Sequence, residues 1–280
     1  MRQTVSRRGF LGGVIAAPVI SCGGPGEAPA VPLASGPDFP VVDLHAHPGE
    51  GVSIDEMIKA AAGHGAKIGM VEHIGLEKYT YPEMIFNDEL LNAWIARLEP
   101  YGIYKGAQAE GQEWPDCFSK EALAKLDYVL TDALTMPEGE KGWTKIWEPG
   151  LELGDKQQWM DRYTDFHVAK IALEPIDIMA NVMFLPRELK DEFDAMWTER
   201  RVRTVVDALA KHDVALEINA NAKLPTENML RMAQDAGVKF TLGTNGRGLR
   251  AGAVEWGVEM ALKLGLTAGD FFLPPGKVAS

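Results

Sequence analysis

The chain has 280 residues, of which 46% are hydrophobic and 24% are charged, and its formal net charge is −12 at pH 7. This composition suits one soluble domain with a sizeable core. An acidic surface repels phosphate backbones, so the charge argues against a nucleic-acid partner and gives no electrostatic help toward anionic substrates.

The first 22 residues read as an export signal. Residues 6–11 (SRRGFL) are typical of a twin-arginine motif, and the apolar run at 11–20 is too short to span a membrane comfortably. The run leads into residues 19–22 (VISC), which resemble a bacterial lipobox with Cys22 as the lipidated residue. An ordinary cleaved signal with an incidental cysteine is the alternative. We therefore expect an exported bacterial protein, periplasmic or held at the membrane only through a lipid anchor at Cys22.

Residues 23–38 are rich in Gly, Pro and Ala and predict a flexible tether, which leaves residues 39–280 as the folded domain. If Cys22 is acylated, Cys117 is the only other cysteine. Neither an intramolecular disulfide nor a cysteine-rich zinc site is then expected.

Strand-like runs alternate with helical patterns after the tether. Strands are expected at residues 41–45, 68–72, 102–109, 128–133, 176–181, 215–219 and 239–245. The first helix begins at Ser53, where Ser53 and Glu56 have the spacing of a capping box, and it ends near Gly63. Further helices are expected at residues 88–98, 120–125, 157–173, 188–211, 226–236 and 252–264.

About seven βα units in strict alternation predict an α/β fold with a parallel sheet, closed or nearly closed into a TIM-like barrel. A doubly wound open sheet is the alternative. No Gly-x-Gly-x-x-Gly follows any expected strand, so dinucleotide binding has no support.

Polar side chains follow every expected strand, and in parallel barrels the chemistry lies at the carboxyl ends of the strands. These side chains are His45 and His47; Glu72 and His73; Gln108, Glu110 and Glu113; Asp132; Asn181; Glu217 and Asn219; and Thr244, Asn245 and Arg247. Because side chains alternate along a strand, Asp43, His45 and His47 are expected to share a face. Two imidazoles on one face can hold one divalent metal, whereas a lone histidine is more often a satisfied core or surface residue.

Two motifs resemble those of the polymerase-and-histidinol-phosphatase (PHP) family. Residues 43–47 (DLHAH) are similar to its D-L-H-x-H motif, and residues 71–73 (VEH) to its T-D-H motif. Weaker likenesses lie at residues 126–130, 175–181, 215–219 and 242–245. The resemblance implies a distorted (β/α)7 barrel and a metal-dependent phosphoesterase with up to three divalent ions.

The resemblance also assigns positions. His45, His47 and His73 match family ligand positions. The family's third-strand Glu ligand falls on Gln108, or is replaced by Glu110 or Glu113 in a shifted register.

Other ligand positions are substituted. The fourth-strand His falls near Leu134, with Asp132 two residues before it, and the fifth-strand His is Asn181. The seventh-strand Asp-x-His becomes Asn245-Gly246-Arg247. Asn is a weak ligand, and Leu and Arg are none. We therefore expect one ion (Zn, Mn or Fe), and the expected ligands are His45, His47, Glu110 and Asp132.

The expected activity is that of a metal-dependent hydrolase, phosphoesterase-like, acting on a small molecule. Arg247 would hold a phosphoryl group bidentately, and His73 or Glu217 would move a proton. A mononuclear-metal hydrolase or lyase acting on a carbohydrate is the first alternative, and a non-catalytic ligand-binding barrel is the second. No nucleophile elbow or reactive cysteine context supports covalent catalysis.

Substrate contacts are expected from Trp114, Asn181, Asn219 and Asn245. Indole faces stack well on sugar rings, although Trp114 can equally serve to pin its loop to the barrel. His167 lies inside an amphipathic helical pattern and is expected to be structural.

Overall fold

The computed structural model describes residues 36–79, 83–138 and 142–275. The expected export signal with Cys22, and the tether up to residue 35, lie outside the described residues. The chain from Pro37 to Ser280 forms one compact unit. No described helix is long and apolar enough to cross a membrane.

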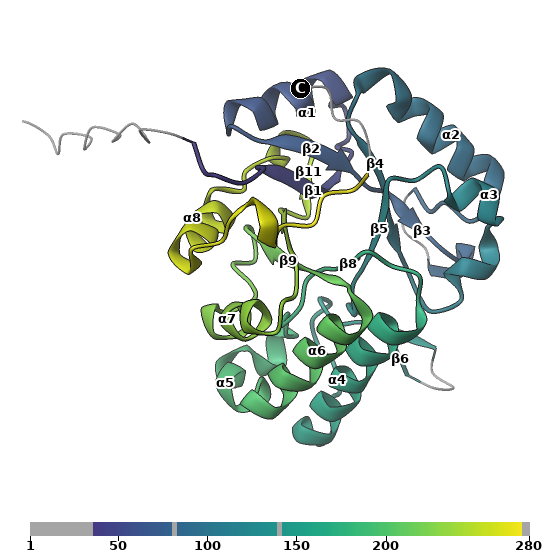
Figure 1. The fold of residues 1–280 in the computed structure, drawn as a ribbon. Helices are drawn as coiled ribbons and strands as arrows, with labels where there is room; N and C mark the ends of the chain where they lie inside the picture. The colour runs from purple at the N-terminus through teal and green to yellow at the C-terminus, as the bar shows by residue number, and fades with distance from the viewer. Residues whose placement is uncertain (1–35, 80–82, 139–141, 276–280) are drawn as a thin grey trace, which may run out of the picture. The chain divides into compact units, whose positions relative to one another are not determined.

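Seven parallel strands close into a barrel surrounded by helices (Figure 1). They are β1 (Val42–His47), β2 (Lys67–Met70), β4 (Tyr104–Ala109), β5 (Tyr128–Thr131), β8 (Ile178–Met179), β9 (Ala215–Asn219) and β10 (Phe240–Gly243). Each strand pairs with the next in this order, and β10 pairs in parallel with β1. The expected (β/α)7 barrel is therefore confirmed, and the open sheet is excluded.

Four shorter strands extend the barrel at its carboxyl-terminal end or stand outside it. They are β3 (His73–Ile74), β6 (Thr135–Pro137), β7 (Trp143–Lys145) and β11 (Gly246–Arg247). β3 pairs with β4, β11 pairs with β1, and β6 and β7 pair antiparallel with each other. The first two of these pairings position the candidate site.

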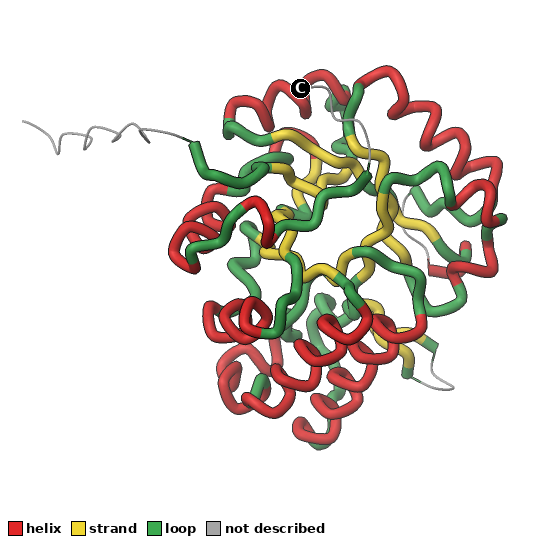
Figure 2. Tube along the Cα trace, in the orientation of Figure 1, coloured by secondary structure: helices red, strands yellow, loops and turns green. Residues whose placement is uncertain are grey.

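The helices pack around the barrel, as the red segments of Figure 2 show. They are α1 (Ile54–Gly63), α2 (Asp88–Leu98), α3 (Lys120–Leu123), α4 (Lys156–Leu173), α5 (Phe193–Met196), α6 (Glu199–His212), α7 (Glu227–Asp235) and α8 (Glu255–Leu264). Short 3-10 turns cover Glu77–Tyr79, Glu99–Tyr101, Trp114–Cys117, Arg187–Glu192, Gly248–Arg250 and Ala268–Asp270.

Local sequence signals explain where several elements begin and end. Ser53 accepts from the Glu56 backbone N–H and Glu56 accepts from the Ser53 N–H, so the expected capping box starts α1. The single helix expected at residues 188–211 is divided, because Thr198 caps a new helix, α6, at its own start. The strand expected at 176–181 stops at Met179, and Asn181 has a left-handed backbone with φ 53°.

The barrel interior is filled by an apolar cluster drawn from strands around the ring. It contains Val42, Leu44, Val71, Tyr104, Tyr128, Leu130, Ile178, Ala180 and Ala215 and is separate from the larger core under the helices. The Tyr128 hydroxyl donates to the Leu44 carbonyl at 2.7 Å. A Cβ at Gly106 would lie 2.3 Å from the Tyr128 ring, so this position requires glycine. The packed interior leaves the polar strand ends as the place for a site.

His167 is buried in α4, and its environment keeps it neutral. Its Nδ1 lies 2.8 Å from the Tyr163 carbonyl, which can only accept, so Nδ1 carries the proton. Burial lowers the pKa of His167 from 6.5 to about 4. The unfolded chain therefore binds this proton more tightly, and folding stability is lost as pH falls from about 6.5 toward 4.

We predict that His167 lowers the unfolding free energy of the wild type by about 2 kcal/mol when the pH falls from 7 to 5. The variant His167→Gln should lack this loss. The measurement is urea unfolding of both proteins at the two pH values. His212→Gln, which changes an exposed histidine at the end of α6, should keep the wild-type loss. An equal pH loss in His167→Gln would contradict the assignment.

Candidate metal centre

Strand pairing at the carboxyl end of the barrel brings polar residues of four strands together. β11 pairs with β1 so that His47 lies opposite Arg247, and β3 pairs with β4 so that His73 lies opposite Gln108. The rings of His47 and His73 stack with their centroids 4.9 Å apart. Segments that are distant in the sequence thus form one site.

Three of these side chains can hold a metal ion. His47, Glu72 and His73 each offer a ligand atom, these atoms all lie within 4.8 Å of one another, and all three residues are buried. Two imidazole nitrogens and a carboxylate oxygen are a donor set that Zn²⁺, Mn²⁺ and Fe²⁺ accept. Among the described residues, no other group of three or more His, Cys, Asp or Glu side chains brings its ligand atoms this close together.

His47 has the burial and the unpartnered nitrogens expected of a metal ligand. It is 0% exposed, and neither of its ring nitrogens has a hydrogen-bond partner in the described part of the chain. Burial, followed by the nearby His73, His45 and Arg247, lowers the pKa of His47 well below 6.5, so the ring is neutral. A buried polar group without a partner costs about 1–3 kcal/mol. The His47 ring therefore fits a metal.

His73 is held in the tautomer that suits a metal ligand. Its Nδ1 lies 2.9 Å from a Glu110 carboxylate oxygen, and its Nε2 lies 3.2 Å from an Arg247 nitrogen. Because a guanidinium can only donate, Nε2 presents its lone pair and Nδ1 donates to Glu110. A carboxylate that accepts from the far nitrogen of a ligating histidine orients the ring and raises its basicity.

Glu72 adds the carboxylate. It is 3% exposed, accepts from the His73 backbone N–H at 3.1 Å, and has an oxygen 4.0 Å from His47 Nδ1. Burial raises the pKa of Glu72, although His73 and Arg247 act in the opposite direction. A cation bound there would favour the ionised carboxylate.

His45, an expected ligand, is occupied on both nitrogens. Its Nδ1 lies 2.6 Å from Glu217 and its Nε2 lies 3.0 Å from the Gln108 amide oxygen. Burial by itself lowers the pKa of His45, but the carboxylate of Glu217, followed by those of Asp132 and Asp43, outweighs it and raises the pKa. With both nitrogens donating, this arrangement leaves no lone pair for a metal.

Asp132, Asn181, Asn219 and Glu217 belong to the same hydrogen-bond network. The Gln108 amide donates to Asp132 at 3.1 Å, and the Asn181 amide donates to Asp132 at 2.8 Å. Asn219 donates to Asn181 at 2.9 Å, and the Asn181 backbone N–H donates to Glu217 at 2.8 Å. Burial raises the pKa of Asp132 to about 6. These strand ends satisfy one another without an ion.

The structure shows where the three candidates for the third-strand ligand position lie. Gln108 and Glu110 are both buried and both contact site histidines, whereas Glu113 is outside the site and accepts from the Tyr79 hydroxyl at 3.1 Å. Trp114 is 1% exposed and donates to Glu174 at 2.9 Å. It fastens its loop to the barrel, and it does not line the cavity described next.

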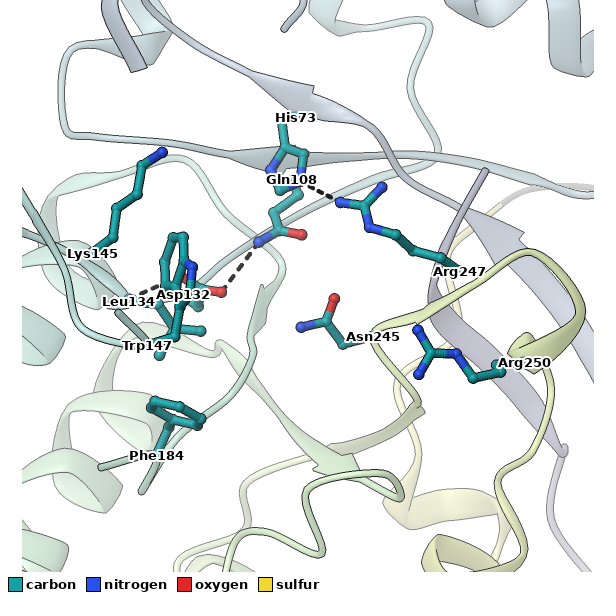
Figure 3. Close-up of a pocket in the computed structure, with 10 residues that line it drawn as sticks. All are labelled: His73, Gln108, Asp132, Leu134, Lys145, Trp147, Phe184, Asn245, Arg247 and Arg250. Carbon is teal, nitrogen blue, oxygen red and sulfur yellow. Dashed lines mark hydrogen bonds between the residues drawn. The ribbon is translucent and has the colours of Figure 1, made fainter. Parts of the chain in front are cut away.

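A cavity of about 450 Å³ opens beside His73 (Figure 3). Its lining consists of His73, Gln108, Asp132, Leu134, Lys145, Trp147, Phe184, Asn245, Arg247 and Arg250. Of the expected site residues, His73, Asp132, Asn245 and Arg247 reach it. Figure 3 shows Arg247 directed at His73 and Asn245 projecting between Gln108 and Arg250. Three cations and two aromatic rings give the cavity a character suited to an anionic group with a flat or apolar substituent.

Sequence reasoning noted Glu72 but did not assign it to the metal, and it missed Lys145, Phe184 and Arg250. The signals for Glu72 were its place at the end of an expected strand and its position in the motif at residues 71–73. Strict alternation puts neighbours such as Glu72 and His73 on opposite faces. In the structure β2 ends at Met70 and β3 begins at His73, so the alternation is interrupted between them.

Comparison with solved structures supports the fold. The chain is similar to a histidinol phosphate phosphatase from Lactococcus lactis, solved with zinc, L-histidinol and phosphate, with a TM-score of 0.59 and 16% sequence identity over 83% of this chain and 98% of that one. At this identity the likeness shows a shared barrel fold. No family model matches the chain, and no curated protein matches it either.

Two further matches are to proteins from Thermotoga maritima. One is a phospho-2-dehydro-3-deoxyheptonate aldolase, with a TM-score of 0.34 and 10% identity over 82% of this chain and 58% of that one. The other is a truncated 3-deoxy-D-arabino-heptulosonate 7-phosphate synthase, with a TM-score of 0.31 and 10% identity over 82% of this chain and 89% of that one.

We predict that the protein binds about one divalent ion per chain and that His47→Leu loses it. Because the His47 nitrogens have no hydrogen-bond partner among the described residues, the apolar substitution should leave the stability of the metal-free protein unchanged or higher. Elemental mass spectrometry and melting temperatures with and without added Zn²⁺ or Mn²⁺ test both points. His64→Gln, a control at a partly exposed histidine, should keep the ion. Retention of the ion by His47→Leu would show that His47 is a core residue.

Glu110→Ala should weaken the metal affinity by about 10–100-fold without abolishing binding, because Glu110 orients His73. Competition with a chromogenic chelator measures the dissociation constant. Glu113→Ala, in the same loop but outside the site, is the matched control. A wild-type affinity for Glu110→Ala would remove Glu110 from the site.

Proposed function

We propose that the chain is a metal-dependent hydrolase of small-molecule phosphoesters, of the PHP type. One observation carries the proposal: His47, Glu72 and His73 form a buried metal-binding group, and Arg247 donates directly to one of its members. A Lewis-acid site beside a guanidinium is an arrangement that phosphoryl chemistry uses. The barrel fold shared with a zinc-containing phosphatase agrees with it.

The donor atoms of His47, Glu72 and His73 would hold the ion. When bound, it would polarise a phosphoryl oxygen and lower the pKa of a water molecule. The described side chains around His45 are engaged in hydrogen bonds with one another, which favours a mononuclear centre.

Arg247 would change partners as the site fills. Its present acceptor is the Nε2 lone pair of His73, and that lone pair is the one a metal requires. Once the lone pair is engaged, the guanidinium needs a new acceptor, and a phosphoryl oxygen is the chemical match. Arg247 would thus bind and orient the ester at the metal.

Asp132 would handle the proton of the reaction. Its carboxyl borders the cavity, and burial raises its pKa to about 6, close to the pH at which an acid–base group works. Asp132 was expected as a metal ligand, whereas His73 and Glu217 were the expected proton carriers. Glu217 is 1% exposed and is already held by His45 and Asn181.

The carbohydrate alternative has one observation in its favour, which is the indole of Trp147 in the cavity wall. The cations of the same wall favour an anionic substrate instead.

Export and anchoring at Cys22 are also part of the proposal, and they rest on the N-terminal sequence motif alone.

The test is hydrolysis of phosphomonoesters and phosphodiesters by metal-loaded protein. We predict that a chelator abolishes the activity, that the ion restores it, and that Arg247→Ala lowers kcat/KM by about 100-fold or more, as the loss of a transition-state donor does. Arg203→Ala, on the exposed side of α6, should behave like the wild type. If metal-loaded protein cleaves neither class of ester, the proposed function is wrong, and a glycoside panel and a ligand screen become the next experiments.

A further inference from the structure

We infer that the ester taken by this site carries a substituent on both sides of the phosphorus, so that the substrate is a phosphodiester and not a terminal phosphomonoester. The inference rests on the proposed function for the identity of the reacting group. The number of substituents on the phosphorus, called arms below, is inferred from the shape of the site.

The site opens into two cavities. The first, about 450 Å³, is the one of Figure 3. The second, about 590 Å³, is lined by Pro48, Gly49, Glu50, Glu72, His73, Glu83, Arg97 and Arg247. Both volumes lie in the range of small-molecule sites, about 300–1,000 Å³. Either cavity alone can take a substituent of substantial size.

The two cavities share part of their walls at the candidate site. The described residues that line both are His73 and Arg247, the metal ligand and the guanidinium that donates to it. Glu72, another member of the metal group, lines the second cavity only. A phosphoryl group held by the metal and Arg247 would therefore border both cavities.

A monoester has one substituent on its phosphoryl group and would fill one cavity. A diester has two substituents and would fill both. Its single negative charge also suits the second cavity better, because Glu50 and Glu83 in its wall repel a dianion.

The two arms would differ in chemistry. Trp147, Phe184 and Arg250 in the first cavity suit a flat ring or an anionic substituent. Glu50, Glu83 and Arg97 in the second suit a substituent bearing hydroxyl or amine groups. In the reaction, the oxygen of a water bonds to phosphorus, one P–O ester bond breaks, and the alcohol leaves with a proton from that water. The products are an alcohol and a phosphomonoester.

The first test is binding, which needs no turnover. Isothermal titration calorimetry on metal-loaded protein compares diphenyl phosphate with phenyl phosphate, and we expect the diester to bind at least about tenfold tighter, since it desolvates a second cavity. Equal or tighter binding of phenyl phosphate overturns the inference.

A pair of variants at one position locates the second arm. Glu83→Trp fills the second cavity and should weaken diphenyl phosphate by about tenfold relative to Glu83→Gln, which keeps the side-chain volume. If the two variants bind the diester equally, no arm occupies the second cavity and the inference fails.

Turnover separates this inference from the proposed function. Bis(p-nitrophenyl) phosphate should be cleaved with a kcat/KM at least about tenfold above that of p-nitrophenyl phosphate, which should accumulate as the product. Preference for the monoester overturns the diester inference and leaves the proposed function standing. Hydrolysis of neither ester removes the proposed function, and the binding comparison then decides the two-armed site by itself.

Discussion

The closure of the barrel between β1 and β10 is the constraint on which the candidate site depends. Asp43 lies at this seam, fully buried, and accepts from the Thr244 N–H at 3.1 Å, the Thr244 hydroxyl at 2.6 Å and the Gly252 N–H at 2.8 Å. These bonds fix the last strand against the first. Only in this register does β11 bring Arg247 opposite His47. The contact between a guanidinium and the metal group is therefore a consequence of closure.

The polar strand ends divide into two sets with opposite properties. Around His45, carboxylates, amides and an imidazole from five strand ends satisfy one another, as buried polar groups in folded proteins normally do. His47 is buried equally deeply, and among the described residues neither of its nitrogens has a hydrogen-bond partner. This difference between a hydrogen-bonded network and an unpartnered ring supports metal binding at His47, Glu72 and His73.

The sequence could predict what depends on periodicity and could not predict what depends on breaks in it. Alternating strand and helix patterns gave the barrel, and strand ends gave His47, His73 and Arg247. Glu72 was not predicted as a metal ligand, because the register of β1 against β2 shifts between Asp43 and Ala46 and the second strand is interrupted before His73. Trp114 was expected to contact the substrate. Its indole instead donates to Glu174 at the end of α4, and residue spacing in the sequence cannot show a contact between positions so far apart.

The charge of the whole chain and the charge of the cavity lead to different conclusions about ligands, and distance decides between them. The net charge of −12 acts on an approaching anion from afar, but at physiological salt it is screened over about 8 Å. Lys145, Arg247 and Arg250 act at contact, where screening is weak. The chain can thus take up an anion that its surface disfavours. The acidic surface favours an anion of low charge, because its repulsion grows with each charge that the anion carries.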